Sequence, residues 1–272
     1  MILGVLLGFA ALAVMSSVIG DGETETLDPV TDEGGLRVTG SEQGDLLDGS
    51  LGNDRFFGKA GDDLIIGQDG DDALFGGDGN DSIFGGGGDD LLRGAAGDDL
   101  VIDSEGTDTL KGDGGDDFIL ATDVLDDAGL ATVKAAPLDE IDPRQLPIDF
   151  ATDTDQTGDQ IFGGHGDDVI IAGAEDTVTA GEGLDELILG TWVEGSEPVT
   201  VTDFSTVDDT LVYAYDEAGT PPVMTLETTQ DASGDPEDTH LLANGELVAI
   251  IVGMAGDFTL DNVVLTGMQA TG

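Results

Sequence analysis

The sequence contains no cysteine, two histidines and only seven lysines and arginines among its 272 residues. Without cysteine the chain can form neither a disulfide nor a thiolate metal site, and two histidines make a histidine-based zinc site implausible. The scarcity of basic residues excludes nucleic acid as a partner, because phosphate binding requires a basic patch. With 59 acidic residues the formal net charge is −52. Because self-repulsion on this scale opposes folding, the composition predicts metal cations or a basic protein as partners.

The sequence motifs of common hydrolases are also missing. The chain has no HExxH motif for a zinc protease, no GxSxG motif for a serine hydrolase and no cysteine to act as a nucleophile. No acidic residue outside the repeats described below has a plausible catalytic partner. We therefore expect that the protein is not an enzyme.

Residues Ile2 to Ile19 form an almost uninterrupted apolar run, which acidic residues follow. Its length lies between the apolar core of a signal peptide and the roughly 20 residues that span a bilayer. A cleavage site could follow Gly20, but no lysine or arginine precedes the run, which favours an uncleaved membrane anchor. A buried core helix is a third interpretation, disfavoured because the run has no polar face. Either of the first two readings predicts a secreted or cell-surface protein.

A nine-residue period runs from Gly40 to Leu120. In this frame nine consecutive segments carry aspartate in the sixth column and an apolar residue in the eighth, and glycine fills the first and fourth columns in eight of nine segments. A disordered acidic tract has no reason to keep such a frame. The sixth column consists of Asp45, Asp54, Asp63, Asp72, Asp81, Asp90, Asp99, Asp108 and Asp117.

The segment from Gly76 to Phe84 reads GGDGNDSIF, and the period resembles the GGxGxDxUx nonapeptide of the repeats-in-toxin (RTX) family. The resemblance implies a right-handed parallel β-roll in which two nonapeptides complete one turn and Ca²⁺ lies between turns at the edge. It also implies that aspartates two copies apart share an ion, as Asp54 would with Asp72. Calcium prefers six to eight oxygen ligands, which carboxylates and the carbonyls of glycine-rich turns supply. An EF-hand is excluded, because it needs a glutamate and none occurs from Gln43 to Ser104.

The period resumes after an interruption. Residues Gly163 to Ile171 form a further full copy with Asp168 in the sixth column, and Asp159 belongs to a partial copy before it. In the same frame the next two segments place Thr177 and Glu186 in the aspartate column, so we expect no metal binding there. The predicted calcium ligands are therefore the nine periodic aspartates together with Asp159 and Asp168.

The outward-facing columns seven and nine differ between the two predicted sheets. One sheet carries an apolar strip that includes Leu64, Phe84 and Phe118, and the other mixes phenylalanines with three basic residues. Because an exposed apolar strip is normally covered, we expect the insertion Ala121 to Thr157 to fold over it. The carboxy-terminal region and a partner protein are the alternatives, and strands that are simply apolar on both sides are a further one.

From Trp192 onward glycine becomes sparse and strand-like segments predict a β-rich cap. The predicted fold is all-β: an apolar helix that is a signal peptide or anchor (1–20), an RTX β-roll (31–120), an insertion (121–157), a second RTX block (158–190) and a β-rich carboxy-terminal cap (191–272). The predicted function is calcium binding by an exported protein that folds on calcium and acts as a scaffold or adhesin-like module with a protein or cell-surface partner. The alternative is an accessory RTX domain of a secreted hydrolase or toxin.

Overall fold

The structure is a computed structural model, and it describes residues 28–29, 34–103, 105–122, 157–230 and 236–268. Within these ranges the chain is built from strands, and helical turns are limited to η3 (Thr191–Val193) and η4 (Leu260–Asn262). The prediction of an all-β fold with parallel, stacked strands is confirmed. The predicted amino-terminal helix (residues 1–20) lies outside the described residues, among which no helix is long and apolar enough to cross a membrane.

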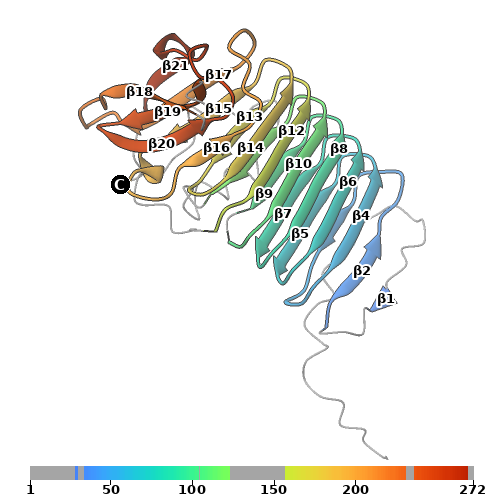
Figure 1. The fold of residues 1–272 in the computed structure, drawn as a ribbon. Coiled ribbons are helices and arrows are strands. Elements are labelled where there is room, and N and C mark those ends of the chain that lie inside the picture. Colours follow the sequence, from blue (N-terminus) through green and yellow to red (C-terminus); the bar gives the residue numbers. More distant parts are fainter. Residues whose placement is uncertain (1–27, 30–33, 104, 123–156, 231–235, 269–272) are drawn as a thin grey trace, which may run out of the picture.

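Two sheets face each other along the roll (Figure 1). The first has twelve strands in the spatial order β1 (Asp28–Pro29), β2 (Leu36–Thr39), β4 (Arg55–Ala60), β6 (Ala73–Asp78), β8 (Leu91–Ala96), β10 (Thr109–Gly114), β12 (Gln160–His165), β14 (Thr177–Glu182), β16 (Val199–Val201), β20 (Glu246–Ile251), β19 (Pro236–Ala243) and β18 (Met224–Gln230). The second has nine strands in the order β21 (Val263–Met268), β17 (Thr210–Asp216), β15 (Glu186–Gly190), β13 (Val169–Ala172), β11 (Phe118–Ala121), β9 (Leu100–Asp103), β7 (Ser82–Gly87), β5 (Leu64–Asp69) and β3 (Leu46–Asp48).

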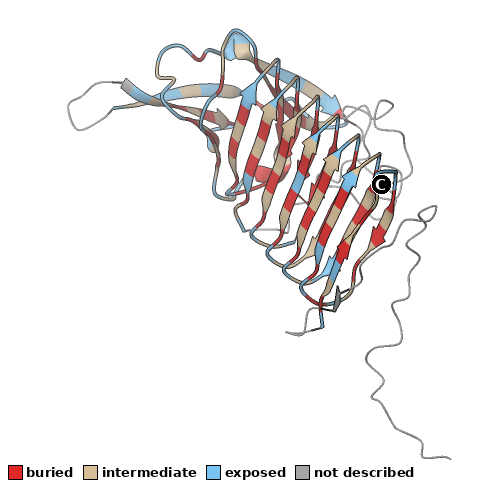
Figure 2. Ribbon diagram, turned by 90° about the vertical axis from the view of Figure 1, so that its right-hand side faces the viewer, coloured by how far each residue is buried: buried red, intermediate tan, exposed pale blue. Residues whose placement is uncertain are grey.

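The core is a single file of apolar side chains from each sheet. Successive side chains of a strand point to opposite faces, so strands such as β4 and β5 bury their second residue, which is the eighth-column residue, between the sheets. Figure 2 shows the result as buried bands that cross neighbouring strands at the same level. The eighth-column residues are at most 3% exposed: Val38, Leu47, Phe56, Ile65, Leu74, Ile83, Leu92, Val101, Leu110, Ile119, Ile161, Ile170, Val178 and Leu187. Such a thin core leaves the turns to supply much of the stability.

Three columns of the turn have distinct backbone requirements. Fourth-column glycines such as Gly79 and Gly97 have positive φ (130° and 125°), which favours glycine. First-column glycines are needed for space, because a Cβ on Gly94 would overlap the carboxylate of Asp99. The second column also has positive φ, yet Ala95 occupies it with φ of 98°. The sequence therefore contains backbone strain at one column of the turn.

Two adjacent substitutions should consequently have opposite effects. Ala95→Gly is expected to stabilise the calcium-saturated protein by about 1 kcal/mol, because glycine adopts positive φ without steric cost. Gly94→Ala is expected to destabilise it by roughly 1–3 kcal/mol, because the added methyl group overlaps a buried carboxylate. Denaturant unfolding at constant calcium measures both changes. Equal effects at the two positions would contradict this account of the turn.

The insertion does not interrupt the stacking of the roll. Strand β10 pairs in parallel with β12, which places Thr109 beside Gln160, and β11 pairs with β13 in the same way. The backbone N–H of Gln160 donates to the carbonyl of Asp108, as Thr109 does to Asp90 one turn earlier, each at 2.9 Å. The segments on either side of residues 123–156 therefore form one continuous solenoid.

The carboxy-terminal region extends both sheets. Strand β16 continues the first sheet in parallel beside β14, and β17 continues the second beside β15. Strands β18, β19 and β20 then pair antiparallel, which changes the strand direction at the end of the first sheet. At the junction Trp192 is fully buried, and its indole N–H donates to the carbonyl of Ala172 at 3.0 Å.

The outer faces of the two sheets differ in the way that the residues of columns seven and nine predict. On the second sheet Phe84, Leu100, Ile102, Phe118 and Leu120 are 1–6% exposed although they point away from the core. This face is therefore buried in the middle of the sheet. The segment predicted to cover it, residues 121–157, lies almost wholly outside the described residues, so its role remains a prediction.

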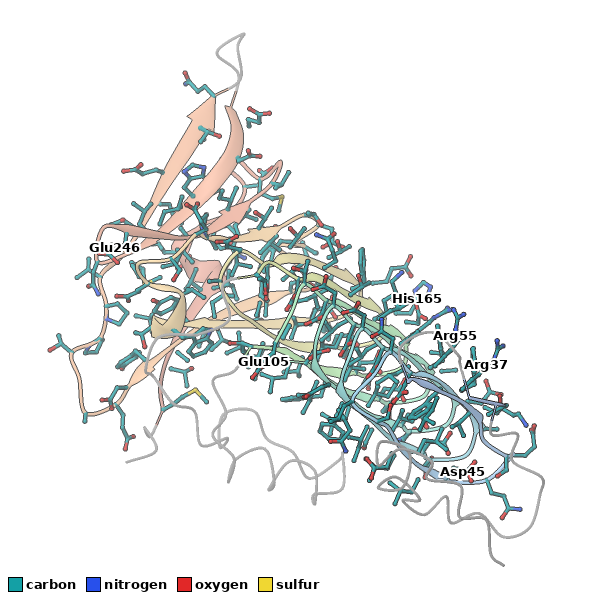
Figure 3. The ribbon with its side chains drawn as sticks, turned by 90° about the horizontal axis from the view of Figure 1, so that it is seen from below. Arg37, Asp45, Arg55, Glu105, His165 and Glu246 are labelled. Carbon is teal, nitrogen blue, oxygen red and sulfur yellow. The ribbon has the colours of Figure 1, made fainter. Side chains whose placement is uncertain are left out.

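The outer face of the first sheet carries basic and aromatic side chains. Phe57 stacks on Phe75 with ring centroids 5.0 Å apart, and the guanidinium groups of Arg37 and Arg55 lie 5.8 and 5.9 Å from the Phe57 centroid. In Figure 3 Arg37 and Arg55 lie along one side of the roll, away from Glu105. Such cross-strand pairs stabilise neighbouring strands and bring positive charge to a strongly acidic protein.

Candidate metal sites

Aspartate side chains form two ladders, one along each edge where the strands of a sheet begin. In each ladder the backbone N–H of one aspartate donates to Oδ1 of the aspartate one turn further, as Asp81 does to Asp99 at 2.8 Å and Asp54 to Asp72 at 2.6 Å. One ladder contains Asp45, Asp63, Asp81, Asp99, Asp117, Asp168, Asp185 and Asp209. The other contains Asp54, Asp72, Asp90, Asp108, Asp159 and Asp176.

The ladders bring together every aspartate that the sequence predicts as a calcium ligand. Aspartates two copies apart are adjacent, as the resemblance implies for Asp54 and Asp72. All of the predicted ligands are at most 5% exposed. The local reason is strand register: the aspartate lies two residues before the buried apolar residue, so its side chain also turns inward at the start of the strand.

Within each ladder the two carboxylate oxygens differ in their surroundings. Oδ1 accepts the N–H of the preceding turn, whereas Oδ2 is buried and accepts no hydrogen bond in Asp63, Asp72, Asp81, Asp99, Asp117, Asp168 and Asp185. A buried carboxylate without donors is costly unless a cation or a proton neutralises it. Calcium coordinates this type of oxygen, so the residues present fit the metal.

Burial also changes the acidity of these groups. Burial, with neighbouring carboxylates adding to it, raises the pKa of Asp99, Asp117 and Asp168 to about 8. The same causes raise the pKa of Asp72 and Asp81 to about 7. A bound divalent cation would reverse this shift, because a nearby positive charge favours the ionised form.

The ends of the ladders are built differently from their middles. The Oδ2 atom of Asp54 accepts the Ser50 N–H at 2.6 Å, and that of Asp209 accepts the Ser205 N–H at 2.6 Å. Asp54 Oδ1 also accepts the Leu36 N–H at 2.5 Å. Protein donors therefore satisfy both carboxylate oxygens of Asp54 and Asp209, whereas inner Oδ2 atoms such as that of Asp99 lack a donor and fit a cation.

A model of the RTX calcium-binding nonapeptide repeat matches the same part of the chain. The matches cover residues 37–65, 48–83, 66–101, 93–123 and 157–177. The chain carries RTX calcium-binding repeats. Calcium is accordingly the cofactor of these repeats, and the resemblance to the RTX nonapeptide seen in the sequence is confirmed.

Solved structures that resemble this chain include the following two. One is the extracellular lipase of Serratia marcescens, with 16% identity and a TM-score of 0.27 over 85% of this chain and 40% of the lipase. The other is a subunit of the mannuronan C5-epimerase of Azotobacter vinelandii, with 16% identity and a TM-score of 0.19 over 83% of this chain and 80% of that one. This chain thus spans less than half of the lipase. No curated protein matches it.

The structure corrects the register of the later RTX copies. Thr177 pairs with Gln160 and Glu186 with Val169, so both lie in the seventh column and not in the aspartate column. The aspartate positions are taken by Asp176 and Asp185, because the copy after Asp168 is one residue shorter. Sequence reasoning missed them by holding a strict nine-residue frame.

A local signal could have revealed these positions. In each case an aspartate precedes a buried apolar residue by two positions, as Asp176 precedes Val178 and Asp185 precedes Leu187. Asp209 precedes Leu211 in the same way and ends its ladder. A strand cannot shift by one residue without exposing its apolar side chains. Aligning the copies on the buried apolar residue, and not on a fixed period of nine, therefore predicts all three aspartates.

The corrected register can be tested with neighbouring residues. Asp185→Asn is expected to weaken calcium binding at the turns that it joins by at least about tenfold, because even the loss of a group that only orients a metal ligand lowers metal affinity about 10–100-fold. Glu186→Gln removes the same charge from the adjacent, partly exposed position and should leave calcium binding unchanged. Calorimetric calcium titration of the two variants measures the difference. A larger loss of calcium affinity in Glu186→Gln than in Asp185→Asn would mean that Glu186 occupies the aspartate column, as the strict nine-residue period predicts.

Proposed function

We propose that this RTX protein is an exported module that folds when calcium fills its two carboxylate ladders, and that it acts as a non-catalytic scaffold or adhesin-like protein. The observation that carries the first part is the set of buried Oδ2 atoms without hydrogen-bond donors in both ladders. Without a cation these charges must be protonated or exposed to water. Folding and calcium binding are then one process.

The thin core strengthens this coupling. Each turn of the roll buries only one eighth-column side chain per sheet, whereas it stacks two further carboxylates on those of the preceding turn. A ligand that binds the folded chain but not the unfolded chain increases the free energy of unfolding, and this increase grows with the logarithm of the ligand concentration. Each calcium ion therefore adds to the stability of the turns that it joins.

Export is supported by the concentrations at which such sites work. Extracellular calcium modules commonly have dissociation constants of about 10⁻⁴ to 10⁻³ M, far above cytosolic calcium. A chain with this affinity would remain expanded before export and fold outside the cell. The apolar run Ile2 to Ile19, which lies outside the described residues, would serve as the signal or anchor.

A non-catalytic role is supported by the chemistry of the residues. The sequence has no hydrolase motif or thiol nucleophile, and the periodic aspartates are engaged in the ladders. The alternative is an accessory domain of a secreted hydrolase or toxin. The calcium-folded protein should therefore show no turnover of ester or peptide substrates, and measurable turnover would favour the alternative.

A calcium titration of the full chain tests the central proposal. We expect a cooperative gain of strand by circular dichroism and a decrease in the radius of gyration by small-angle scattering, with coincident midpoints near millimolar calcium. Magnesium should fail to replace calcium, because it demands near-octahedral geometry and retains its water ligands. Strand content that does not depend on calcium would refute coupled folding.

A further inference from the structure

One RTX copy departs from the repeat by placing an acid at the first column. Asp103 ends strand β9 where eight other copies have glycine, and its side chain is 2% exposed. Its Oδ1 atom accepts the N–H of Gly86 at 3.2 Å. A Cβ at a first-column position meets a ladder carboxylate, as it would at Gly94, so the Asp103 side chain enters the roll beside the ladder aspartates.

Asp103 lies beside an existing pair of ladder aspartates. One carboxylate oxygen from each of Asp90, Asp103 and Asp108 lies within 4.8 Å of the other two. Because calcium binds oxygen at about 2.3–2.6 Å, oxygens at such separations can share one ion. Asp90 and Asp108 are 3% and 1% exposed, so all three groups are removed from water.

A second observation indicates where the oxygens converge. A Cβ built on Gly85 would overlap Oδ2 of Asp103 and lie 2.5 Å from Oδ2 of Asp90. The two oxygens therefore point at one small cradle beside the Gly85 Cα atom. The Asp90 Oδ2 atom is buried and accepts no hydrogen bond from an N–H or hydroxyl group.

We propose that Asp103 is a calcium ligand that gives the Asp90–Asp108 site a third carboxylate and makes it the tightest site of the described roll. The affinity of a calcium site increases with the number of charged ligands and with the rigidity of the site. Calcium therefore fills this site first and fixes the middle turns, on which the remaining turns stack. The inference rests on calcium binding by the repeats and deepens the proposed function.

Asp103→Gly returns the glycine that the repeat has at this column, and its calcium affinity shows whether Asp103 is a ligand or a substitution that the fold merely tolerates. If Asp103 is a ligand, Asp103→Gly and the isosteric Asp103→Asn should each weaken the first-filled site about tenfold. If Asp103 is merely tolerated, Asp103→Gly should bind calcium about as well as the wild type, because it returns the glycine that eight other copies have at this column. The control Asp69→Asn removes an exposed charge at the end of β5 and should have no effect.

Calorimetric calcium titration of the full chain, with circular dichroism on the same samples, distinguishes the outcomes. A tight first phase in the wild type that is lost in both Asp103 variants and kept in Asp69→Asn supports the inference. A wild type that folds with calcium but shows no tight phase, or an Asp103→Gly variant that keeps it, overturns this inference alone. A wild type that binds no calcium overturns the proposed function as well.

Discussion

Asp99→Asn is expected to raise the calcium concentration at half-folding by at least about tenfold. Asp99 stands in the middle of the longer ladder, between Asp81 and Asp117, and is fully buried. If each ion lies between aspartates of successive turns, this one side chain serves two neighbouring ions. Losing a charged ligand should cost at least as much as losing a group that only orients a ligand, which lowers metal affinity about 10–100-fold.

The asparagine variant isolates charge from hydrogen bonding. The amide oxygen of the substituted side chain could still accept the Asp81 N–H, which donates to Oδ1 of Asp99 at 2.8 Å in the wild type. The matched control is Asp98→Asn, which removes an adjacent charge from an exposed side chain that accepts the Asp116 N–H at 2.9 Å. Circular dichroism during calcium titration gives both midpoints. Equal shifts in the two variants would mean that general charge repulsion, and not the ladder, controls folding.

Without calcium, acidification from pH 8 to about pH 5 is expected to increase the strand content of the protein. Burial raises the pKa of ladder aspartates such as Asp99 to about 8 and Asp81 to about 7, above the ordinary value of 3.8. Between about pH 4 and pH 8 the folded metal-free roll therefore binds more protons than the unfolded chain. Its stability decreases as the pH rises through this window and is lowest above pH 8.

With calcium present the dependence on pH should be reversed. Protons and calcium compete for the same carboxylates, so the calcium midpoint should increase as the pH falls from 8 to 5. Acidification also reduces the net charge of −52, and weaker self-repulsion by itself makes an unfolded chain more compact. Circular dichroism, which reports strand content, is therefore a better measure than the size of the protein. Strand content that is constant from pH 5 to pH 8 without calcium would contradict the raised pKa values. A calcium midpoint that falls on acidification would contradict competition at the ladders.

The contacts between successive turns contribute stability that this chain does not obtain from disulfides or from a thick core. The chain has no disulfide, and its core is one side chain deep on each sheet. Each turn instead adds backbone hydrogen bonds to the preceding turn and two carboxylates that require a cation. If folding and calcium binding are coupled as proposed, the calcium concentration decides whether the chain is folded.

The nine-residue period by itself determined the repeating part of the structure. An aspartate followed two positions later by an apolar residue specifies a strand that buries the second and turns the first inward, as Asp81 and Ile83 do. This rule is local, because side-chain alternation depends only on neighbouring residues of one strand. The predicted core follows from it, whereas the pairing of aspartates two copies apart is what the resemblance to the RTX nonapeptide implies.

Only the tertiary structure decided which residues meet when the period fails. The shortened copy brings Asp176 and Asp185 into the ladders, and Asp108 joins Asp159 across 51 residues. Asp103 reaches Asp90 only because one turn lies on another. In each case hydrogen bonds to the preceding turn fix the register of the strand. A missing residue or a long insertion then changes only the segment that connects two strands. Such contacts join residues far apart in the chain, and a period counted along the sequence cannot represent them.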